Sequence, residues 1–323
     1  MRKFDKVLIR GADTVGSFVL ATPFYRELRK NLVNSYIVLC VKPLVYEIAK
    51  GCPYVDKTIC YEKDTRKNIK LIKEENFDSV FLISGSFESA LVSFLSGIKN
   101  RVGYPHDYRG FLLTQKIVEK EKKHYIDYIL EILVQSGFSY YDKGLEVYVK
   151  NVESQYDNLI REENVVGLNL TAVGDNARSW PKEYIATLIE KLSQEGYQVI
   201  TFGTNKDLLL SKFLKEKLGE EVFLDLIGKT SLSEFVSLVK KCSYFIAVAT
   251  GGVHIAASLG VKTIALYCPG DDVYWGPVGK NVKVITKHTK CAPCNQHKMK
   301  YCENNVCMKQ ISVDEVIESL RNW

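Results

Sequence analysis

The sequence predicts an α/β protein with two doubly wound parallel sheets in tandem, and three observations lead to that fold class. Short runs rich in β-branched and aromatic residues alternate with helical stretches, as in parallel sheets that are covered by helices. The series of runs starts again after a polar connection, and 323 residues are enough for two cores of ordinary domain size. We therefore expect two Rossmann-like domains, residues 1–155 and 156–323.

Each domain is expected to contain a series of short strands. In the first domain these are Lys6–Ile9, Tyr36–Val41, Thr58–Tyr61, Ser79–Ile83 and Arg101–Tyr104. In the second they are Val165–Leu170, Gln198–Phe202, Phe223–Leu226, Tyr244–Val248, Thr263–Tyr267 and Val282–Ile285. The polar segment Val147–Asn158 follows the amphipathic stretch His124–Gln135, so we expect it to connect the domains and place the boundary near residue 155.

Composition and charge limit the classes of partner. The chain has 44 basic and 38 acidic residues, a formal charge of +6, which suits an anionic ligand but is too small to indicate nucleic-acid binding. The N-terminus lacks the apolar stretch of a signal peptide, and no uncharged apolar run approaches the roughly 18 residues of a membrane span. We expect a cytoplasmic protein, which could still contact anionic lipid at a membrane surface.

A glycine-containing loop, Arg10–Ser17, leaves the first strand and enters a helix expected over Ser17–Lys30. Ligands bind at this carboxyl edge of a parallel sheet. The loop lacks the lysine of a P-loop and the third glycine of the dinucleotide fingerprint, which argues against a nucleoside triphosphatase or a dehydrogenase. Two interpretations of Asp13 are open: it caps the helix, as Thr14 also could, or its carboxylate acts as a general base.

The segment Tyr244–Gly260 predicts a strand, a tight glycine turn and a helix. Free N–H groups and the helix dipole make Thr250, Gly251 and Gly252 an expected anion site. His254 falls in the first helical turn, where it could donate to a phosphate oxygen, although a lone histidine is more often structural. Upstream, Arg178 is expected near the ligand and Trp180 in the core, before a helix that begins after Pro181.

Several motifs together resemble one family, the ADP-heptose:lipopolysaccharide heptosyltransferases of glycosyltransferase family 9. The matching stretches are Val7–Lys30, Asn100–Leu133, Val165–Leu192 with Trp180-Pro181, Asp225–Leu232, Thr250–Gly260, Pro269–Gly279 with Trp275-Gly-Pro277, and Cys291–Val316. The resemblance implies a GT-B fold with an interdomain cleft and an inverting transfer that uses no catalytic metal. It also implies that the C-terminal domain binds an ADP-sugar and that the N-terminal domain binds the acceptor, a lipopolysaccharide core or another glycan or protein.

The resemblance also assigns donor-binding residues. Arg178 stands where the family has a phosphate-binding lysine, and arginine keeps that charge and adds donors. Asp225 stands where an acidic residue holds the ribose, and Thr250, Gly251 and His254 match the diphosphate-binding turn. The predicted set for the nucleotide sugar is completed by Thr171, Lys229 and Gly252.

Two positions depart from the family pattern. The family usually has Gly-Asp where this chain has Gly16-Ser17, and an aspartate before the phosphate turn where this chain has Ala249. Three explanations are open: Asp13 replaces the missing base, the donor sugar or the acceptor differs, or the protein binds nucleotide sugars without transferase activity. An epimerase of similar architecture is a further alternative.

Four cysteines near the C-terminus, Cys291, Cys294, Cys302 and Cys307, have the spacing C-x2-C-x7-C-x4-C. Four thiolates suit a structural zinc or iron ion, and His297 could replace one of them. Free thiols, or disulfides formed on purification, are the alternatives. The surrounding lysines are expected to be a solvated surface or to meet an anionic acceptor or the inner membrane. In the first domain, acceptor phosphates are expected to meet some of Arg10, Arg101, Arg109 and Lys116.

Overall fold

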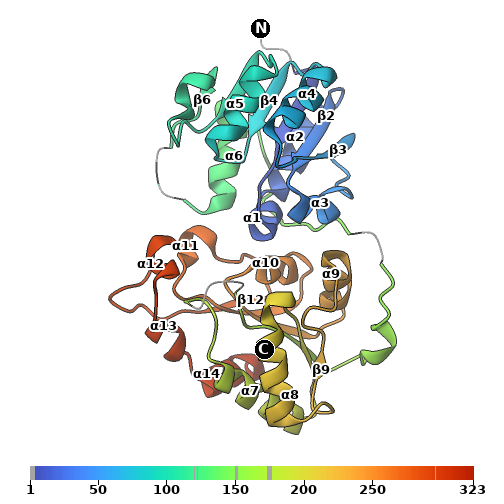
Figure 1. Cartoon of the computed structure of the whole chain (residues 1–323), viewed down its shortest axis with the longest axis vertical. Helices are drawn as coiled ribbons and strands as arrows, with labels where there is room; N and C mark the ends of the chain where they lie inside the picture. Colours follow the sequence, from blue (N-terminus) through green and yellow to red (C-terminus); the bar gives the residue numbers. More distant parts are fainter. Residues whose placement is uncertain (1–3, 120, 122, 150–151, 173–176, 295) are drawn as a thin grey trace. The chain divides into compact units, whose positions relative to one another are not determined.

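The computed structural model divides into two compact units, Met1–Lys150 and Asn151–Trp323 (Figure 1). It describes residues 4–119, 121, 123–149, 152–172, 177–294 and 296–323. Each unit contains a six-stranded parallel sheet, with strand order β3-β2-β1-β4-β5-β6 in the first and β12-β11-β10-β7-β8-β9 in the second. The predicted fold class is confirmed. The units divide a few residues before the expected boundary at residue 155.

Every predicted strand is present, with ends that differ by a residue at most. The first sheet contains β1 (Lys6–Arg10), β2 (Tyr36–Val41), β3 (Lys57–Cys60), β4 (Ser79–Leu82), β5 (Asn100–Gly103) and β6 (Gln115–Lys116). The second contains β7 (Val165–Asn169), β8 (Gln198–Thr201), β9 (Leu224–Asp225), β10 (Tyr244–Val248), β11 (Lys262–Leu266) and β12 (Val282–Ile285). Only β6 was not expected, because two residues are too short to show a pattern.

Helices connect the strands and cover the sheets. In the first unit they are α1 (Val15–Leu20), α2 (Thr22–Asn31), α3 (Pro43–Ala49), α4 (Thr65–Glu75), α5 (Phe87–Leu95), the 3-10 helix η1 (Arg109–Leu112) and α6 (Tyr125–Gln135). In the second they are η2 (Asp157–Leu159), α7 (Lys182–Gln194), η3 (Asn205–Asp207), α8 (Leu208–Leu218), α9 (Leu232–Lys240), α10 (Gly251–Ser258), α11 (Asp272–Trp275), α12 (Gln296–Lys300), α13 (Val306–Lys309) and α14 (Val313–Arg321). Within the described residues, none of these helices has the length and apolar character of a membrane span.

The single helix expected over Ser17–Lys30 is instead two helices, α1 and α2. Ala21 ends the first and precedes the second, and Pro23 lies in the first turn of α2. Proline has no N–H to continue the hydrogen-bond ladder of α1. The Thr22 side chain compensates, because its Oγ1 donates to the Val19 carbonyl at 2.7 Å.

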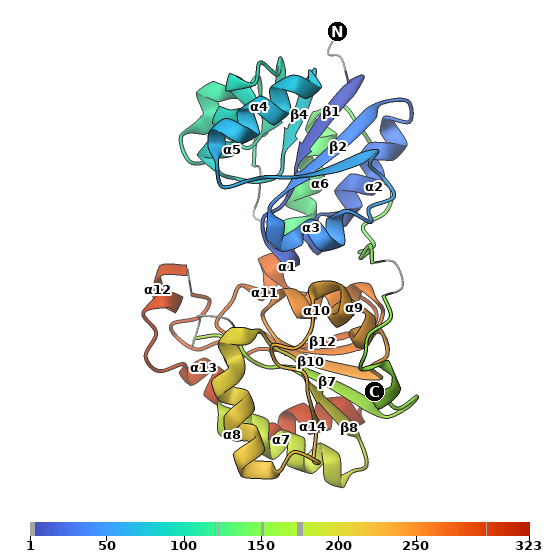
Figure 2. The same cartoon turned by 45° about the vertical axis from the view of Figure 1, so that its right-hand side comes forward.

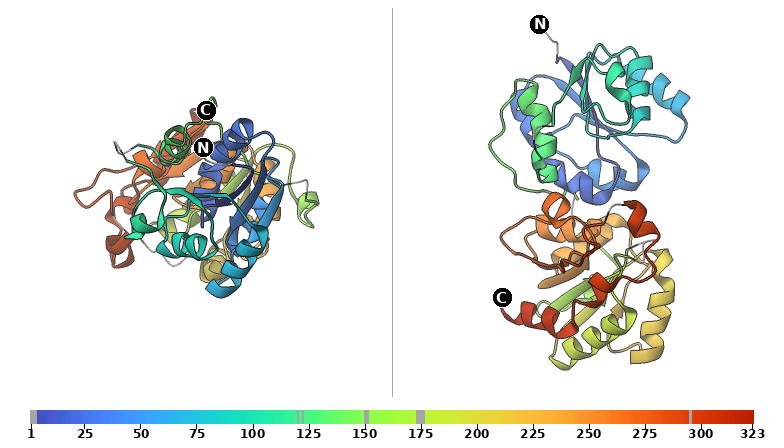
Figure 3. Two further views of the ribbon diagram at one scale, coloured as in Figure 1. Left: turned by 90° about the horizontal axis from the view of Figure 1, so that it is seen from above. Right: turned by 90° about the vertical axis from the view of Figure 1, so that its left-hand side faces the viewer.

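Alternate residues of each central strand pack on opposite faces of the sheet. In β10, Ile246 and Val248 belong to one apolar cluster, while Phe245 and Ala247 belong to another. The first cluster contains residues of α7 and α14 and the second contains residues of α9 and α10. These two pairs of helices lie on opposite sides of the second sheet (Figure 3). In the first unit, α4 and α5 cover one face of the sheet, and α2 and α6 cover the other (Figure 2). Trp180 lies in the core of the second unit, as expected, and its Nε1 donates to the Ile311 carbonyl at 3.1 Å.

Each sheet has one point where the strand order reverses, between β1 and β4 in the first and between β7 and β10 in the second. Connections leave the two strands on opposite sides at such a point, which opens a crevice at their carboxyl ends. Asp13 and Ser84 follow β1 and β4, while Asn169 ends β7 and Thr250 follows β10. The two reversal points are therefore where candidate functional residues gather.

Candidate active site

In the second unit, the first turn of α10 is left open to a ligand. Thr250 occupies the N-cap position, yet its side chain makes no capping hydrogen bond to the helix. Its Oγ1 instead donates to Asn169 Oδ1 at 2.9 Å, and Asn169 Nδ2 donates to the Phe202 carbonyl at 3.1 Å. The first amides of α10 therefore keep their donor capacity and the positive end of the helix dipole, which together favour an anion.

Close packing around the same turn requires a glycine at position 252, and Arg178 places a positive charge beside the turn. A Cβ on Gly252 would lie 2.9 Å from Asn169 Oδ1 and 3.2 Å from Phe235 Cζ, so only glycine fits without displacement. Arg178 Nη1 donates to the Ala249 carbonyl at 3.1 Å, which places the guanidinium beside the turn. His254 is buried on the same helix. The structure thus gathers five of the predicted residues, Arg178, Thr250, Gly251, Gly252 and His254, while Thr171 follows β7 at the same sheet edge.

Asp225 and Lys229 lie elsewhere, at the edge strand β9. Asp225 is buried, and its carboxylate accepts hydrogen bonds from Thr201 Oγ1 at 3.1 Å and Ser211 Oγ at 2.6 Å. The backbone N–H of Ile227 donates to it at 3.2 Å, and Lys229 Nζ donates to the Asp225 carbonyl at 2.7 Å. The ribose-binding role implied by the family stays a prediction, and these contacts give Asp225 a structural role in joining β9 to α8.

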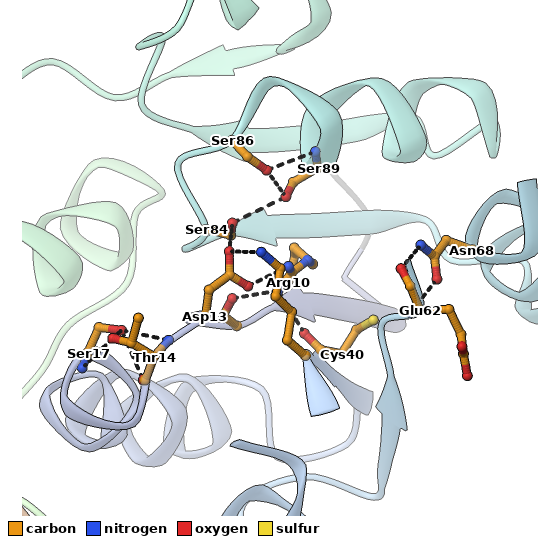
Figure 4. A network of polar contacts seen from close by, with 12 residues as sticks. Arg10, Asp13, Thr14, Ser17, Cys40, Glu62, Asn68, Ser84, Ser86 and Ser89 are labelled. Atoms are coloured by element: carbon orange, nitrogen blue, oxygen red, sulfur yellow. Dashed lines mark hydrogen bonds and ion pairs between the residues drawn. The ribbon is translucent and has the colours of Figure 1, made fainter. Parts of the chain in front are cut away.

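In the first unit, Asp13 lies at the centre of a polar network (Figure 4). Its Oδ1 accepts from Arg10 Nη2 at 2.6 Å, and its Oδ2 accepts from Ser84 Oγ at 2.9 Å and lies 3.2 Å from Lys42 Nζ. Partial burial raises the pKa of Asp13. Arg10 above all, with Lys42 and Ser84, lowers it by more than burial raises it, so the pKa lies below its ordinary value. Asp13 is therefore ionised at neutral pH.

The helix cap at this turn is made by Thr14 and Ser17. Thr14 Oγ1 accepts from the Ser17 N–H, and the two hydroxyl oxygens lie 2.7 Å apart, while Ser17 Oγ donates to the Thr14 carbonyl at 3.1 Å. The interpretation of Asp13 as the cap is therefore wrong. Ser17 belongs to the cap. Gly11 is needed here, because a Cβ would lie 2.8 Å from Val41 Cγ1.

Three of the four cations expected to meet acceptor phosphates are bound internally. The guanidinium of Arg109 is buried and donates to the carbonyls of Tyr104 and Ser84. Arg101 donates to the Leu112 carbonyl, and Arg10 donates to the Asp13 carboxylate and to the Gly11 carbonyl. Lys116 is exposed. Lys42 was missed by the sequence analysis, although its place after β2, at the same sheet edge as Asp13, could have indicated it.

The four predicted metal ligands share one loop but differ in exposure. Cys291 is exposed, Cys294 and Cys302 are half-buried, and Cys307 is buried. Burial raises the pKa of Cys307 to about 11, and the nearby sulfurs of Cys268, Cys291 and Cys294 add to this shift. Across the described residues, no group of three or more His, Cys, Asp or Glu side chains is arranged to hold a metal ion. The structural zinc or iron ion on these cysteines is therefore not confirmed and stays a prediction.

The lysines near this loop are partly engaged by α14. Lys283 Nζ donates to the Ser319 carbonyl at 3.0 Å, and Lys287 forms an ion pair with Glu315 at 2.8 Å. Both lysines hold the end of the chain against the second sheet. These two are therefore not free to form the anion-binding surface considered above.

Comparison with known proteins decides the family. The family model described as glycosyltransferase family 9 (heptosyltransferase) matches residues 65–304. The chain belongs to glycosyltransferase family 9. It is 26% identical over 311 residues to lipopolysaccharide heptosyltransferase 2 of Escherichia coli, with 87% of each protein covered. It is also 24% identical over 327 residues to lipooligosaccharide heptosyltransferase 2 of Campylobacter jejuni, with 98% of each covered.

A solved structure shares the fold of this family 9 chain. The E. coli ADP-heptose LPS heptosyltransferase II superposes with a TM-score of 0.81 at 23% identity, with 98% of each chain covered. The predicted GT-B fold is confirmed. The relatives also support the prediction of a glycosyltransferase and give no support to the alternative of a binding protein without activity.

Proposed function

We propose that this glycosyltransferase moves a heptose from ADP-heptose to the core saccharide of a lipopolysaccharide, with inversion at the anomeric carbon. The observation that carries the proposal is the uncapped start of α10 with Arg178 beside it. A family 9 chain with such a turn is suited to a diphosphate, the group that leaves when a nucleotide sugar reacts. The names of its relatives supply the heptose and the lipopolysaccharide.

The second unit would stabilise the departing diphosphate. Negative charge grows on the leaving ADP as the bond to the sugar breaks, so donors that are fixed before reaction favour the transition state. The amides of Gly251 and Gly252, the guanidinium of Arg178 and the imidazole of His254 would supply these donors, whereas the Thr250 N–H already donates to the Val248 carbonyl at 2.6 Å. Their combined charge would replace a divalent cation, which supports a transfer without catalytic metal.

The first unit would supply the base. Asp13 is ionised and a quarter exposed at 25%, so one of its oxygens can exchange the Lys42 contact for the acceptor hydroxyl. The hydroxyl becomes strongly acidic only as it attacks the anomeric carbon, and a carboxylate of low pKa can take its proton at that point. Transfer therefore needs both units, with the acceptor assigned to the first and the donor to the second. Because the proposed acceptor is linked to a lipid, we place the enzyme in the cytoplasm at the surface of the inner membrane.

Donor preference is tested by thermal unfolding with ADP-, UDP- and GDP-sugars at equal concentration, because a ligand that binds the folded state raises Tm more the tighter it binds. We expect ADP-heptose to raise Tm most, and a UDP- or GDP-sugar with the larger shift would exclude the proposed donor. Transfer is then measured on a lipopolysaccharide core saccharide, and the anomeric configuration of the product is read by NMR. Retention of configuration would contradict the mechanism.

The base is tested with Asp13→Asn. Loss of a general base lowers turnover by roughly 10²- to 10⁴-fold, while donor affinity should stay unchanged because Asp13 lies in the other unit. Ser17→Ala is the matched control in the same turn, and it should reduce stability slightly through the lost cap without affecting turnover. Turnover of Asp13→Asn near that of Ser17→Ala would exclude Asp13 as the base.

A further inference from the structure

Helix α5 buries small residues and leaves its largest apolar residues in solvent. Its buried residues are Ser89, Ala90, Val92 and Ser93, of which Ala90 and Val92 pack in the apolar core of the first unit. Phe87, Phe94 and Leu95 are exposed, and Phe94 retains 47% of its accessible surface. A helix that covers a sheet normally turns its large apolar residues inward. The three exposed apolar residues therefore need an explanation.

The buried serines serve the network around Asp13. Ser84 Oγ donates to Asp13, and Ser89 Oγ donates to Ser84 Oγ at 3.3 Å (Figure 4). Ser86 Oγ lies 2.6 Å from Ser89 Oγ, and it also caps α5 by accepting from the Ser89 N–H. Part of the inner face of α5 thus joins the polar network, while Ala90 and Val92 pack in the apolar core. This explains the serines but does not explain why the outer face is aromatic.

Aromatic residues of η1 extend the exposed face of α5. Tyr108 and Phe111 are 94% and 75% exposed, and the ring of Phe111 lies 6.2 Å from that of Phe87. We define the α5–η1 face by the residues Phe87, Phe94, Leu95, Tyr108 and Phe111. Exposed apolar groups gathered in this way mark an interaction surface, unlike the scattered apolar residues of an ordinary surface.

Cations border this face. The Arg101 guanidinium lies 5.3 Å from the centre of the Phe94 ring. Lys99, two residues before Arg101, is exposed. Lys116 Nζ lies beside η1, 3.9 Å from the position a Cβ would take on Gly110. Glu88, the one carboxylate in the α5 sequence, accepts from Thr65 Oγ1 at 2.8 Å. Exposed aromatic rings with lysines at their border suit the interface of an anionic bilayer, where rings enter the headgroup layer and cations meet phosphates.

We propose that the α5–η1 face docks on the surface of an anionic phospholipid membrane. A second copy of the chain is a weaker candidate, because a two-fold contact through this face would bring the cations of both copies together. The inference deepens the proposed function, since a lipopolysaccharide acceptor carries a lipid anchor, but membrane binding is measured without any sugar transfer. It assigns the membrane contact to the first unit and not to the lysine-rich loop of the second.

The test is co-sedimentation of the full chain with vesicles of phosphatidylcholine mixed with phosphatidylglycerol, and with phosphatidylcholine alone. We expect binding to the anionic vesicles only, weakened by salt. The double variant Phe94→Ser, Phe111→Ser should bind at least about tenfold more weakly, because two partly exposed aromatic rings are lost. Lys99→Gln and Lys116→Gln should each weaken binding about fivefold. Circular dichroism and Tm verify that these surface variants remain folded.

Two control variants and one further measurement decide the outcome. Leu209→Ser removes a side chain that is 83% exposed on α8, and Tyr301→Ser removes an exposed ring beside the lysine-rich loop. Both should bind vesicles like the wild type. The proposal is overturned if the wild type ignores anionic vesicles, if the double serine variant binds like Leu209→Ser, or if Tyr301→Ser is the variant that loses binding. A concentration-dependent dimer in sedimentation equilibrium that the double serine variant abolishes would also overturn it.

Activity measurements separate this inference from the proposed function. The double serine variant should transfer to a water-soluble core saccharide at the wild-type rate and lose rate only with an acceptor embedded in vesicles. A wild type that binds vesicles but transfers to neither acceptor would refute the proposed function and leave membrane docking standing.

Discussion

Replacing Asn169 with alanine is expected to weaken donor binding while the fold keeps nearly all of its stability. Asn169 Oδ1 accepts the Thr250 hydroxyl at 2.9 Å and so holds it away from the first amides of α10. In the variant the hydroxyl is free to rotate and cap its own helix, as a threonine at this position ordinarily does. The diphosphate would then have to displace the cap before it reaches the same amides.

The structure gives the size of both effects. The variant loses two hydrogen bonds, from Thr250 and to the Phe202 carbonyl, at about 1 kcal/mol each, and gains a cap of about 1 kcal/mol. The free energy of unfolding should therefore fall by only about 1 kcal/mol. The donor Kd should rise about fivefold, because breaking the cap costs about 1 kcal/mol.

A double-mutant cycle with Thr250→Ala isolates the cause. Without the Thr250 hydroxyl no side chain is available to cap α10 from that position, so Asn169→Ala should leave the donor Kd of Thr250→Ala unchanged. Calorimetric titration with the ADP-sugar measures Kd for the four proteins, and thermal unfolding measures their stability. Equal weakening by Asn169→Ala in both backgrounds would refute the reasoning, because Asn169 would then act directly on the donor or through general damage to the fold.

Three further predictions follow from the same contacts. Burial raises the pKa of Asp13, but Arg10 and Lys42 lower it by more, so the proposed base stays ionised into acidic pH. Lys42→Gln removes one of these cations and should move the acid limb of the pH profile of kcat/KM to higher pH. An unchanged acid limb would show that Lys42 does not influence the base. Arg178→Leu should raise the donor KM about 10- to 100-fold, because a charge-assisted contact is lost, whereas Arg178→Lys should keep most of the affinity. Steady-state kinetics with varied donor concentration measures both values. Equal KM values for the two variants would contradict the prediction. Dialysis against EDTA should leave the turnover of the wild type unchanged, and a loss restored by Mg²⁺ would show that a metal shares the diphosphate charge.

Strand positions could be predicted because the buried strands are continuous apolar runs bounded by polar turns. The turn at Thr250–Gly252 between β10 and α10 could be predicted for a related reason: a glycine pair between a strand and a helix leaves few alternatives for the backbone. The break between α1 and α2 was harder, since Pro23 is tolerated in the first turn of a helix and its position alone does not locate the previous helix end. The capping role of Thr14 was one of two possibilities that only the structure separated.

The hydrogen-bond partners of individual side chains could not be predicted from the sequence. Arg10, Arg101 and Arg109 were all candidates for acceptor phosphates, yet their guanidiniums bind carbonyls and a carboxylate within their own unit. Two partners of Arg10 are one and three residues away, and carbonyls that Arg101 and Arg109 reach are 11 and 25 residues away. Only the folded conformation of the turns decides which of these groups each guanidinium meets. The buried Ser89 of α5 is a similar case, because its partner Ser84, which donates to Asp13, belongs to another connection.

The comparison of Asp13 with Asp225 shows what makes a carboxylate available for chemistry. Both follow or end a strand, both accept several hydrogen bonds, and the sequence assigned both to the site. The Asp225 side chain is 5% exposed and is held by two hydroxyls and an amide at an edge strand, so a ligand would have to replace internal donors. The Asp13 side chain is 25% exposed at a point where the strand order reverses, and one of its partners, Lys42, is itself 46% exposed. A contact with a mobile surface lysine costs little to exchange, since exposed ion pairs contribute about 1 kcal/mol or less. These contacts favour Asp13 over Asp225 as the carboxylate that would receive an acceptor hydroxyl, and the ribose-binding role of Asp225 stays a prediction.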